Sequence, residues 1–225
     1  MKVELIAYTP NPEDVCGIAA KTCTSEETPS DGSGNALKHA ISSGHLSVCE
    51  HASFTFAVSG VSRALTHQLV RHRIASYSQQ SQRYVNMGRF EYVIPQTVFD
   101  VRDSFDMGDE YPSNEPLYAW DWIMGEINAL YRALIDKGVP EEDARYILPN
   151  ACTTNIIVTM NARELRHFFS LRCCNRAQWE IRELANKMLK LVKPVAPTIF
   201  ANAGPSCVQT GRCPEGKKSC GRWKE

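Results

Sequence analysis

The chain has 225 residues, 43% of them hydrophobic, and its 25 basic and 25 acidic side chains give a formal net charge of zero. A chain of this size can bury the core of one large domain or two small ones. The neutral balance disfavours a general polyanion-binding protein, and there is no apolar run of the roughly 18 residues that a membrane span needs. Nine scattered cysteines favour reduced thiols, so we expect a cytoplasmic protein without a membrane partner.

Local patterns predict an alternation of strands and helices. Runs rich in β-branched or aromatic residues predict strands at 3–8, 53–58, 90–94 and 154–160. Capping residues and apolar periodicity predict helices at 11–22, 35–43, 63–70, 115–137 and 141–146, a further helix beginning at Asn161, and one from Asn175 to the residue before Pro194. No linker divides the chain before Ala203. We therefore expect one domain over residues 1–203 and a Cys/Lys-rich tail over 204–225.

The chain lacks Asp and Glu throughout positions 51–90, although one residue in nine is acidic overall. Such a gap arises by chance in roughly one window in a hundred. The same window holds five arginines: Arg63, Arg71, Arg73, Arg83 and Arg89. A nearby carboxylate would neutralise these guanidiniums, so its absence predicts a site for phosphate or another oxyanion.

Within this window, a cationic helix is expected to lead into a polar loop. Ser62 can cap a helix that places Arg63, His67 and Arg71 on one stripe. The Ser, Gln and Tyr residues beyond Arg73 could surround a phosphate or the edge of a base. The structural alternative is a solvated basic helix followed by an ordinary polar loop.

The motif Arg71-His72-Arg73, followed after seven residues by Ser81, resembles the signature of the flavin-dependent thymidylate synthases. Segments with the same order and spacing lie upstream and downstream of it, at 43–54, 144–149, 161–165 and 171–181. The resemblance covers roughly residues 1–200. It implies an α+β fold, with a mixed, mainly antiparallel sheet and packed helices.

The resemblance also implies two sets of binding residues. The residues expected to bind FAD are Ser47, Arg71, His72, Arg73, Gln79, Asn161, Arg163 and His167. Those expected to bind dUMP are Gln68, Arg71, Gln79, Gln80, Ser81, Gln82, Arg83, Arg145 and Arg172. Several arginines suit a nucleotide monophosphate and a pyrophosphate. At Gln79 many family members carry Glu, so this chain offers an uncharged amide there.

Arg172 has the most chemical role that the resemblance implies. A guanidinium facing the pyrimidine can stabilise negative charge that develops on the ring. The alternative for Arg172 is a surface ion pair with Glu164 or Glu180. Cys173 and Cys174 are expected to be small core residues rather than nucleophiles, and Ser81 is assigned to binding.

By resemblance, the reaction is the reductive methylation of dUMP to dTMP. FAD would carry the hydride, NADPH would supply it, and 5,10-methylenetetrahydrofolate would donate the carbon. The resemblance further implies a homotetramer with shared active sites. No GxGxxG motif is present, so the flavin site is not expected to be a Rossmann one.

Two other interpretations remain open. The first is an RNA-binding protein that uses the arginine-rich window 63–89, with Tyr77 and Tyr84 stacking on bases; the acidic stretch 100–143 and the neutral net charge argue against it, so no nucleic-acid partner is expected. The second is a zinc-dependent assembly module built on tail cysteines Cys207, Cys213 and Cys220, with the fourth ligand from Cys16, Cys23 or a neighbouring subunit. We expect no metal site, because these separations are not the tight Cys-x-x-Cys spacing of zinc sites.

Overall fold

The computed structural model describes residues 1–101, 108 and 115–222, and their contacts divide the chain into two compact units. Unit 1 comprises Met1–Ser59, Leu65–Ser78 and Asn155–Glu225, and unit 2 comprises Gly60–Ala64 and Gln79–Thr154. The described part of the expected tail therefore groups with unit 1. No helix among the described residues is long and apolar enough to cross a membrane.

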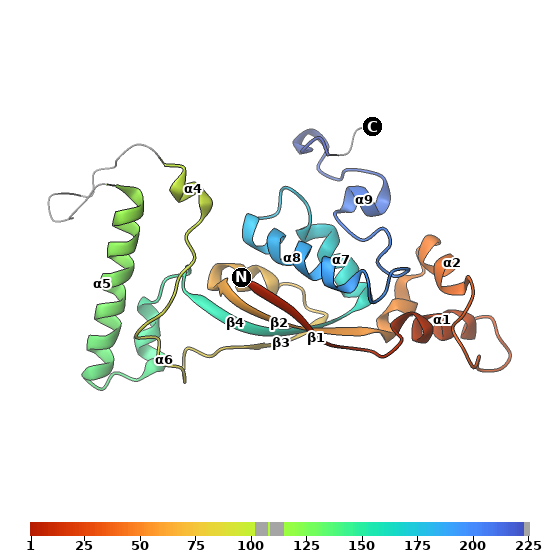
Figure 1. Cartoon of the computed structure of the whole chain (residues 1–225), viewed down its shortest axis with the longest axis horizontal. Coiled ribbons are helices and arrows are strands. Elements are labelled where there is room, and N and C mark those ends of the chain that lie inside the picture. Colours follow the sequence, from red (N-terminus) through yellow and green to blue (C-terminus); the bar gives the residue numbers. More distant parts are fainter. Residues whose placement is uncertain (102–107, 109–114, 223–225) are drawn as a thin grey trace. The chain divides into compact units, whose positions relative to one another are not determined.

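Unit 1 is built on a four-stranded sheet with the strand order β1-β2-β4-β3 (Figure 1). The strands are β1 (Lys2–Tyr8), β2 (Ser53–Ser62), β3 (Ala75–Gln79) and β4 (Thr153–Asn161). β1 and β2 are antiparallel, with Leu5 opposite Phe56 and an irregularity between Leu5 and Ala7. The end residues of β2, β3 and β4 belong to unit 2.

Alternation along the central strands builds the core of unit 1. Because successive side chains of a strand point to opposite faces, one face collects the apolar residues of β2 and β4. These are Phe54, Phe56, Val58, Ile156, Val158 and Met160, each at most 2% exposed. The helices α7 (Ala162–Arg172) and α8 (Trp179–Val192) lie over the sheet (Figure 1). Both bury an apolar stripe, including Phe168 and Leu184.

Shorter elements complete unit 1. They are α1 (Pro12–Thr22), α2 (Ala36–Ser42), the 3-10 helix η1 (Leu46–His51), most of α3 (Arg63–Leu69), α9 (Ser206–Thr210) and the 3-10 turn η3 (Gly216–Lys218). In α3, Leu65 and Leu69 are fully buried, as the predicted amphipathic pattern requires. Glu13 at the start of α1 accepts hydrogen bonds from the backbone of Ile199 at 3.1 Å and from the hydroxyl of Thr198 at 3.0 Å.

Unit 2 has a core of its own. Its helices are α4 (Gln96–Phe99), α5 (Pro116–Asp136), α6 (Glu141–Ala144) and the 3-10 turn η2 (Arg145–Ile147). Buried side chains of α5, such as Met124 and Tyr131, pack with Met87, Phe90 and Cys152. The Tyr131 hydroxyl accepts a hydrogen bond from the backbone N–H of Met87 at 3.2 Å, so this buried polar group has a partner.

The α+β prediction is confirmed, while three local predictions are wrong. Residues 75–79, expected to be loop, form β3. The strand expected at 90–94 is reduced to an isolated bridge between Tyr92 and Cys152. The helix expected from Asn175 begins at Trp179, because the side chain of Gln178 accepts the hydrogen bonds from the backbone N–H groups of Glu180 and Ile181.

Candidate active site

A cleft of about 570 Å³ lies in unit 1 beside the first turns of α7. Its lining includes Leu46, Glu50, Ile74, Asn161, Arg163 and His167. Three of the residues predicted to bind FAD, Asn161, Arg163 and His167, therefore line one cleft. A fourth, Ser47, is exposed on η1, between two of the lining residues.

The start of α7 fixes these side chains. Asn161 has extended backbone geometry, and its Oδ1 accepts a hydrogen bond from the backbone N–H of Glu164 at 2.8 Å. The predicted N-cap is confirmed. Arg163 and His167 are four residues apart on α7, and hence lie on one face of the helix. The guanidinium of Arg163 pairs with Glu50 of η1, which closes one side of the cleft.

Arg166 is a lining residue that the sequence did not single out. It is 4% exposed, and its two Nη atoms donate to the Ile199 carbonyl at 2.5 Å and the Asn202 side chain at 3.0 Å. Among the described residues no acceptor meets its buried Nε. Burial lowers the pKa of Arg166. Its contacts fix the guanidinium, which adds positive charge beside the cleft rather than an accessible donor. Its spacing of three from Arg163 was the only signal in the sequence.

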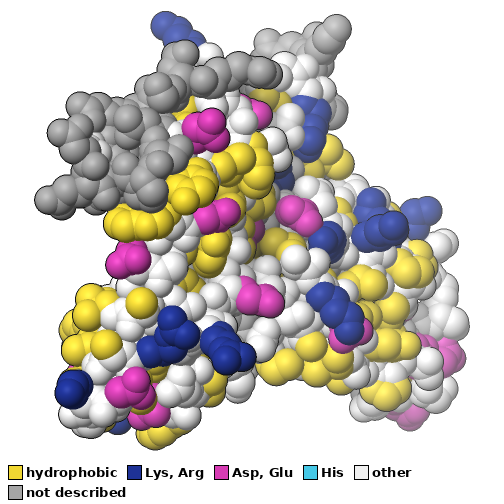
Figure 2. Space-filling view, turned by 60° about the vertical axis from the view of Figure 1, so that its left-hand side comes forward, with side chains coloured by type: hydrophobic (Ala, Val, Ile, Leu, Met, Phe, Trp, Pro, Cys, Tyr) yellow, Lys and Arg dark blue, Asp and Glu magenta, His cyan; other side chains and the backbone are white. Residues whose placement is uncertain are grey.

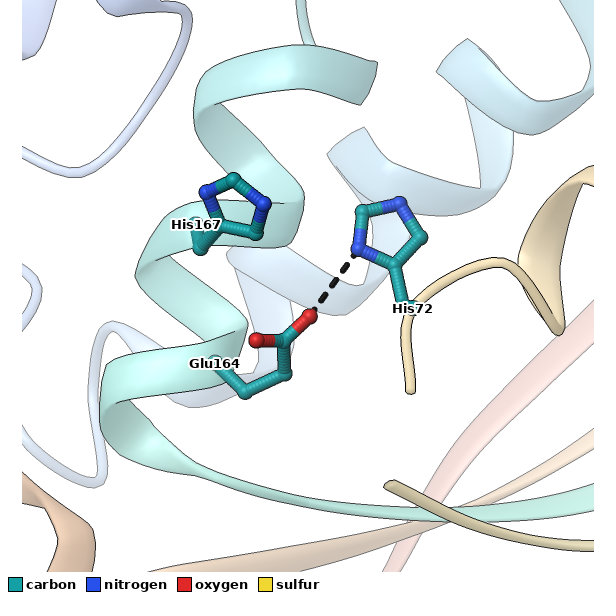
Figure 3. A group of neighbouring side chains, drawn as sticks. All are labelled: His72, Glu164 and His167. Carbon is teal, nitrogen blue, oxygen red and sulfur yellow. Dashed lines mark hydrogen bonds and ion pairs between the residues drawn. The ribbon is translucent and has the colours of Figure 1, made fainter. Parts of the chain in front are cut away.

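His72 connects the arginine motif to α7 (Figure 3). Its Nδ1 lies 3.0 Å from Glu164 Oε1, and its Nε2 lies 3.1 Å from Nε of Arg172. A guanidinium can only donate, so Nε2 is the acceptor and Nδ1–H donates to the carboxylate. Burial lowers the pKa of His72, and this effect outweighs the hydrogen bond to Glu164, which raises it; the nearby Arg172 also lowers it. His72 is therefore a neutral, 4% exposed connector.

The same neighbourhood has the dimensions of a metal site. Ligand atoms of His72, Glu164 and His167 all lie within 4.8 Å of one another. However, Nδ1 of His72 donates to Glu164 and Nε2 accepts from Arg172. A metal ion would need a free lone pair on one of these two nitrogens, and both are already used in hydrogen bonds. The group is therefore better described as a hydrogen-bond network.

Arg172 ends α7 with its guanidinium held in place. Besides His72, it contacts the carbonyl of Gln68, 3.4 Å from Nη2. Burial lowers the pKa of Arg172. The alternative of a surface ion pair between Arg172 and Glu164 is not observed. The imidazole of His72 lies between them and is hydrogen-bonded to both. Arg71 and Arg73 flank His72, and both are exposed.

The other predicted nucleotide residues lie in unit 2. Arg83 donates from Nε and Nη2 to the Glu142 carboxylate at 3.0 and 2.8 Å, and Arg145 donates to the Glu142 carbonyl at 3.0 Å. Glu142 thus brings Arg83 and Arg145 together. The sequence predicted that the arginines of window 51–90 would lack carboxylate partners. For Arg83 this is wrong, because Glu142, 59 residues away, supplies one.

The loop around Arg83 is held by its own polar side chains. The amide of Gln79 donates to the Thr154 hydroxyl at 3.3 Å, and the buried Gln82 contacts Cys152 Sγ at 3.8 Å. Ser81 Oγ accepts from the backbone N–H of Arg83 at 3.2 Å. Gln80 is partly buried. The backbone of this loop is therefore shaped before any ligand arrives.

The features expected of an RNA-binding surface are weak. The Tyr77 hydroxyl lies 2.8 Å from the Leu69 carbonyl and 2.9 Å from the His72 carbonyl, and its ring is partly buried. Tyr84 is exposed, with the Arg83 guanidinium 5.4 Å from its ring centre. On the face shown in Figure 2, acidic side chains lie among the basic ones. This arrangement does not favour RNA binding.

The fold and the cleft define an α+β protein with buried and exposed arginines around a nucleotide-sized space. The family model "Thymidylate synthase complementing protein" matches residues 4–198. Flavin-dependent thymidylate synthases of Geobacter sulfurreducens and Clostridium tetani are each 51% identical, over 100% of this chain and 96% and 95% of theirs. The chain belongs to the flavin-dependent thymidylate synthase family.

A solved structure agrees with this assignment. The flavin-dependent thymidylate synthase of Helicobacter pylori, complexed with FAD and dUMP, superposes with a TM-score of 0.68 and 26% sequence identity. The match covers 91% of this chain and 100% of the other. The predicted family and fold class are thereby confirmed.

Proposed function

We propose that this enzyme converts dUMP to dTMP, with FAD as hydride carrier, NADPH as reductant and 5,10-methylenetetrahydrofolate as carbon donor. The observation that carries the proposal is the cleft at the start of α7, where Arg163, Arg166 and His167 meet in a chain of this family. Fixed cationic donors around a 570 Å³ space fit a dinucleotide with a pyrophosphate.

The residues of this chain would bind and orient the two nucleotides. The predicted set that would hold FAD is Ser47, Arg71, His72, Arg73, Gln79, Asn161, Arg163 and His167. The buried charge of Arg166 lies beside them on the cleft wall. When bound, FAD supplies the hydride chemistry. His72 would act through its backbone or through the guanidinium it positions, since its side chain is buried between Glu164 and Arg172.

The second set of residues would hold dUMP. The residues proposed to bind dUMP are Gln68, Arg71, Gln79, Gln80, Ser81, Gln82, Arg83, Arg145 and Arg172. Arg172 would stabilise negative charge on the pyrimidine. The imidazole of His72 accepts from its Nε, so the direction of the guanidinium is set before substrate binds.

We further propose a cytoplasmic homotetramer with shared active sites. The presence of exposed apolar side chains on strands of unit 1, at Ile6, Tyr8 and Ile157, supports self-association. All nine cysteines are free thiols, which suits a reducing compartment. Light scattering on the purified protein would give the mass of the assembly, and a monomer would contradict the tetramer.

The activity can be tested with the purified protein. We expect a yellow preparation that bleaches under anaerobic NADPH and forms dTMP when dUMP and 5,10-methylenetetrahydrofolate are added. The Arg172→Ala variant should remain yellow but lose turnover by about 100- to 1000-fold, the usual effect of removing one charge-stabilising donor. Arg89→Ala, at an exposed arginine outside both predicted sets, is the matched control.

Two results would contradict the proposal. A colourless protein that cannot be reconstituted with FAD, and that shifts RNA with a steep salt dependence, would favour the nucleic-acid interpretation. Unchanged turnover of Arg172→Ala would contradict the proposed role of Arg172 in stabilising charge on the pyrimidine, and would leave it a structural role at the end of α7.

A further inference from the structure

Four of the nine cysteines line one small cavity that the catalytic chemistry does not use. The cavity has a volume of about 70 Å³ and lies between the C-terminal end of α7 and the tail. Its cysteines are Cys174, Cys207, Cys213 and Cys220. Three come from the tail, and Cys174 comes from the turn after α7.

The tail is fixed to α7 by hydrogen bonds that bring these cysteines together. The Ser206 hydroxyl donates to the Ser170 carbonyl at 3.2 Å, and the Gln209 amide donates to the Arg166 carbonyl at 2.8 Å. Gly211 then turns the chain with φ 69°, in the left-handed region that favours glycine. The chain thus returns past α7 twice, first at Cys207 and then at Cys213 and Cys220.

The surroundings of the cavity suit thiolates. The side-chain amide of Asn175 donates to Cys220 Sγ at 3.5 Å, and Arg222 donates to the Asn175 side chain at 2.6 Å. Arg176 also lies on the cavity wall, where its guanidinium pairs with Glu215 at 3.4 Å. The Asn175 amide and the Arg222 guanidinium would partly offset the negative charge of a cluster of thiolates.

We propose that Cys174, Cys207, Cys213 and Cys220 bind one structural zinc ion. Four thiolates satisfy the tetrahedral preference of zinc, with Zn–S distances of about 2.3 Å and no open position for catalysis. The cavity exceeds the roughly 10–15 Å³ that one water-sized occupant needs. Among the described residues, no three of these sulfur atoms lie within 4.8 Å of one another, so the cysteine side chains would have to rotate to surround an ion.

The structure supplies a ligand that sequence spacing did not. The sequence offered Cys16 or Cys23 as the fourth ligand. Cys16 is fully buried beside Cys49 in α1, where burial raises the pKa of its thiol to about 12, and Cys23 lies exposed at the end of α1. Cys174, expected to be a core residue, is only partly buried and faces the cavity instead.

Metal analysis of untagged protein, purified under reducing conditions without chelator, tests the site. We expect about one zinc per chain, with Cys213→Ser and Cys220→Ser losing at least tenfold in zinc content. Cys23→Ser is the matched control and should keep its zinc. Because Cys220 is exposed, its substitution should leave the fold intact, which circular dichroism can verify.

Cobalt provides a second readout that does not depend on activity. Protein reconstituted with Co²⁺ alone should show the intense visible bands of tetrahedral thiolate coordination, beyond the flavin absorption, and Cys220→Ser should not. Three results would overturn the site: wild-type protein that takes up neither metal, variants that retain zinc like the control, or a mass showing a disulfide between two of the four cysteines.

Discussion

At the scale of single residues, the position of Arg172 depends on a neutral histidine. A direct carboxylate partner would cancel the positive charge that the pyrimidine is proposed to meet. Here the imidazole of His72 accepts from Arg172 Nε, and the carboxylate of Glu164 lies on the far side of the ring. The guanidinium is oriented without being paired directly to Glu164.

This arrangement predicts a pH dependence of stability. Burial and Arg172 hold the pKa of His72 below its ordinary value of about 6.5. Below that pH, the unfolded chain binds a proton that the folded chain resists, so the free energy of unfolding falls as the pH falls from 6.5 towards the lowered pKa. The contribution is fully present above 6.5. Urea unfolding measured from about pH 7.5 to 5 should show the loss.

The variant His72→Gln separates this effect from other titrations. A glutamine amide can donate to Glu164 and accept from Arg172, but it does not titrate. Its unfolding free energy should change less between about pH 6.5 and 5 than that of the wild type. His39→Gln, at an exposed histidine of α2, should behave like the wild type. Equal slopes for His72→Gln and the wild type would contradict a buried neutral His72.

At the scale of elements, α7 contributes more lining residues to the cleft than any other described element. It provides Arg163, Arg166 and His167 near its start and Arg172 at its end, and its N-cap Asn161 is itself a predicted flavin residue. The position of the helix start therefore decides the geometry of the cleft.

Removal of the cap should weaken α7 in a measurable way. Asn161→Ala deletes the acceptor for the Glu164 N–H and should cost about 1 kcal/mol in the unfolding free energy of FAD-free protein. Asn161→Asp keeps an acceptor at the helix start and should retain most of that stability. Denaturant titration of the two variants gives the comparison. Equal stability of Asn161→Ala and wild type would show that packing alone fixes the helix start.

Elements with strong local signals could be predicted from the sequence, and those defined by distant partners could not. The Asn161 cap and the buried stripe of α8 follow from spacing alone. β3 was not predicted because its residues, such as Ser76 and Ser78, also favour loops. Its alternation is visible only in the structure, where Tyr77 is partly buried between two exposed serines. Glu142 meets Arg83 from 59 residues away, and no local pattern encodes such a pair.

The candidate site shows the same limit. The arginine motif and the α7 residues were identified by their resemblance to a family, and the cleft brings three of the latter together. Burial of His72 and Arg166 could not be predicted, because histidine and arginine are mostly at least partly exposed. Cys174 was assigned to the core because nothing in its spacing links it to a tail more than 30 residues later.

At the scale of the whole molecule, the predicted ligand residues are divided between two units. The FAD residues lie in unit 1 except Gln79, whereas most dUMP residues lie in unit 2. Each unit has a hydrophobic core of its own. Binding of FAD should therefore stabilise chiefly the unit that holds α7.

Thermal unfolding can measure this linkage. FAD at about 100 times its dissociation constant should add about 2.7 kcal/mol, which corresponds to a rise in Tm of about 5–11 °C for a chain of this length. Arg163→Ala, which removes one cleft donor, should show a smaller rise at the same FAD concentration. Lys38→Ala, at an exposed residue of α2 outside the α7 cleft, serves as the control. An identical rise for Arg163→Ala would place FAD elsewhere.

Hydrogen bonds that involve Glu164 and His72 connect the N-cap of α7 to its last residue. Asn161 accepts from the Glu164 backbone, the Glu164 carboxylate accepts from His72, and His72 accepts from Arg172. The helix between these ends is about 15 Å long. His72 lies outside the helix and links Glu164, in its first turn, to Arg172, its last residue, through two hydrogen bonds. The Glu164 carboxylate lines the cleft, so the residue that holds His72 against Arg172 is itself part of the cleft wall.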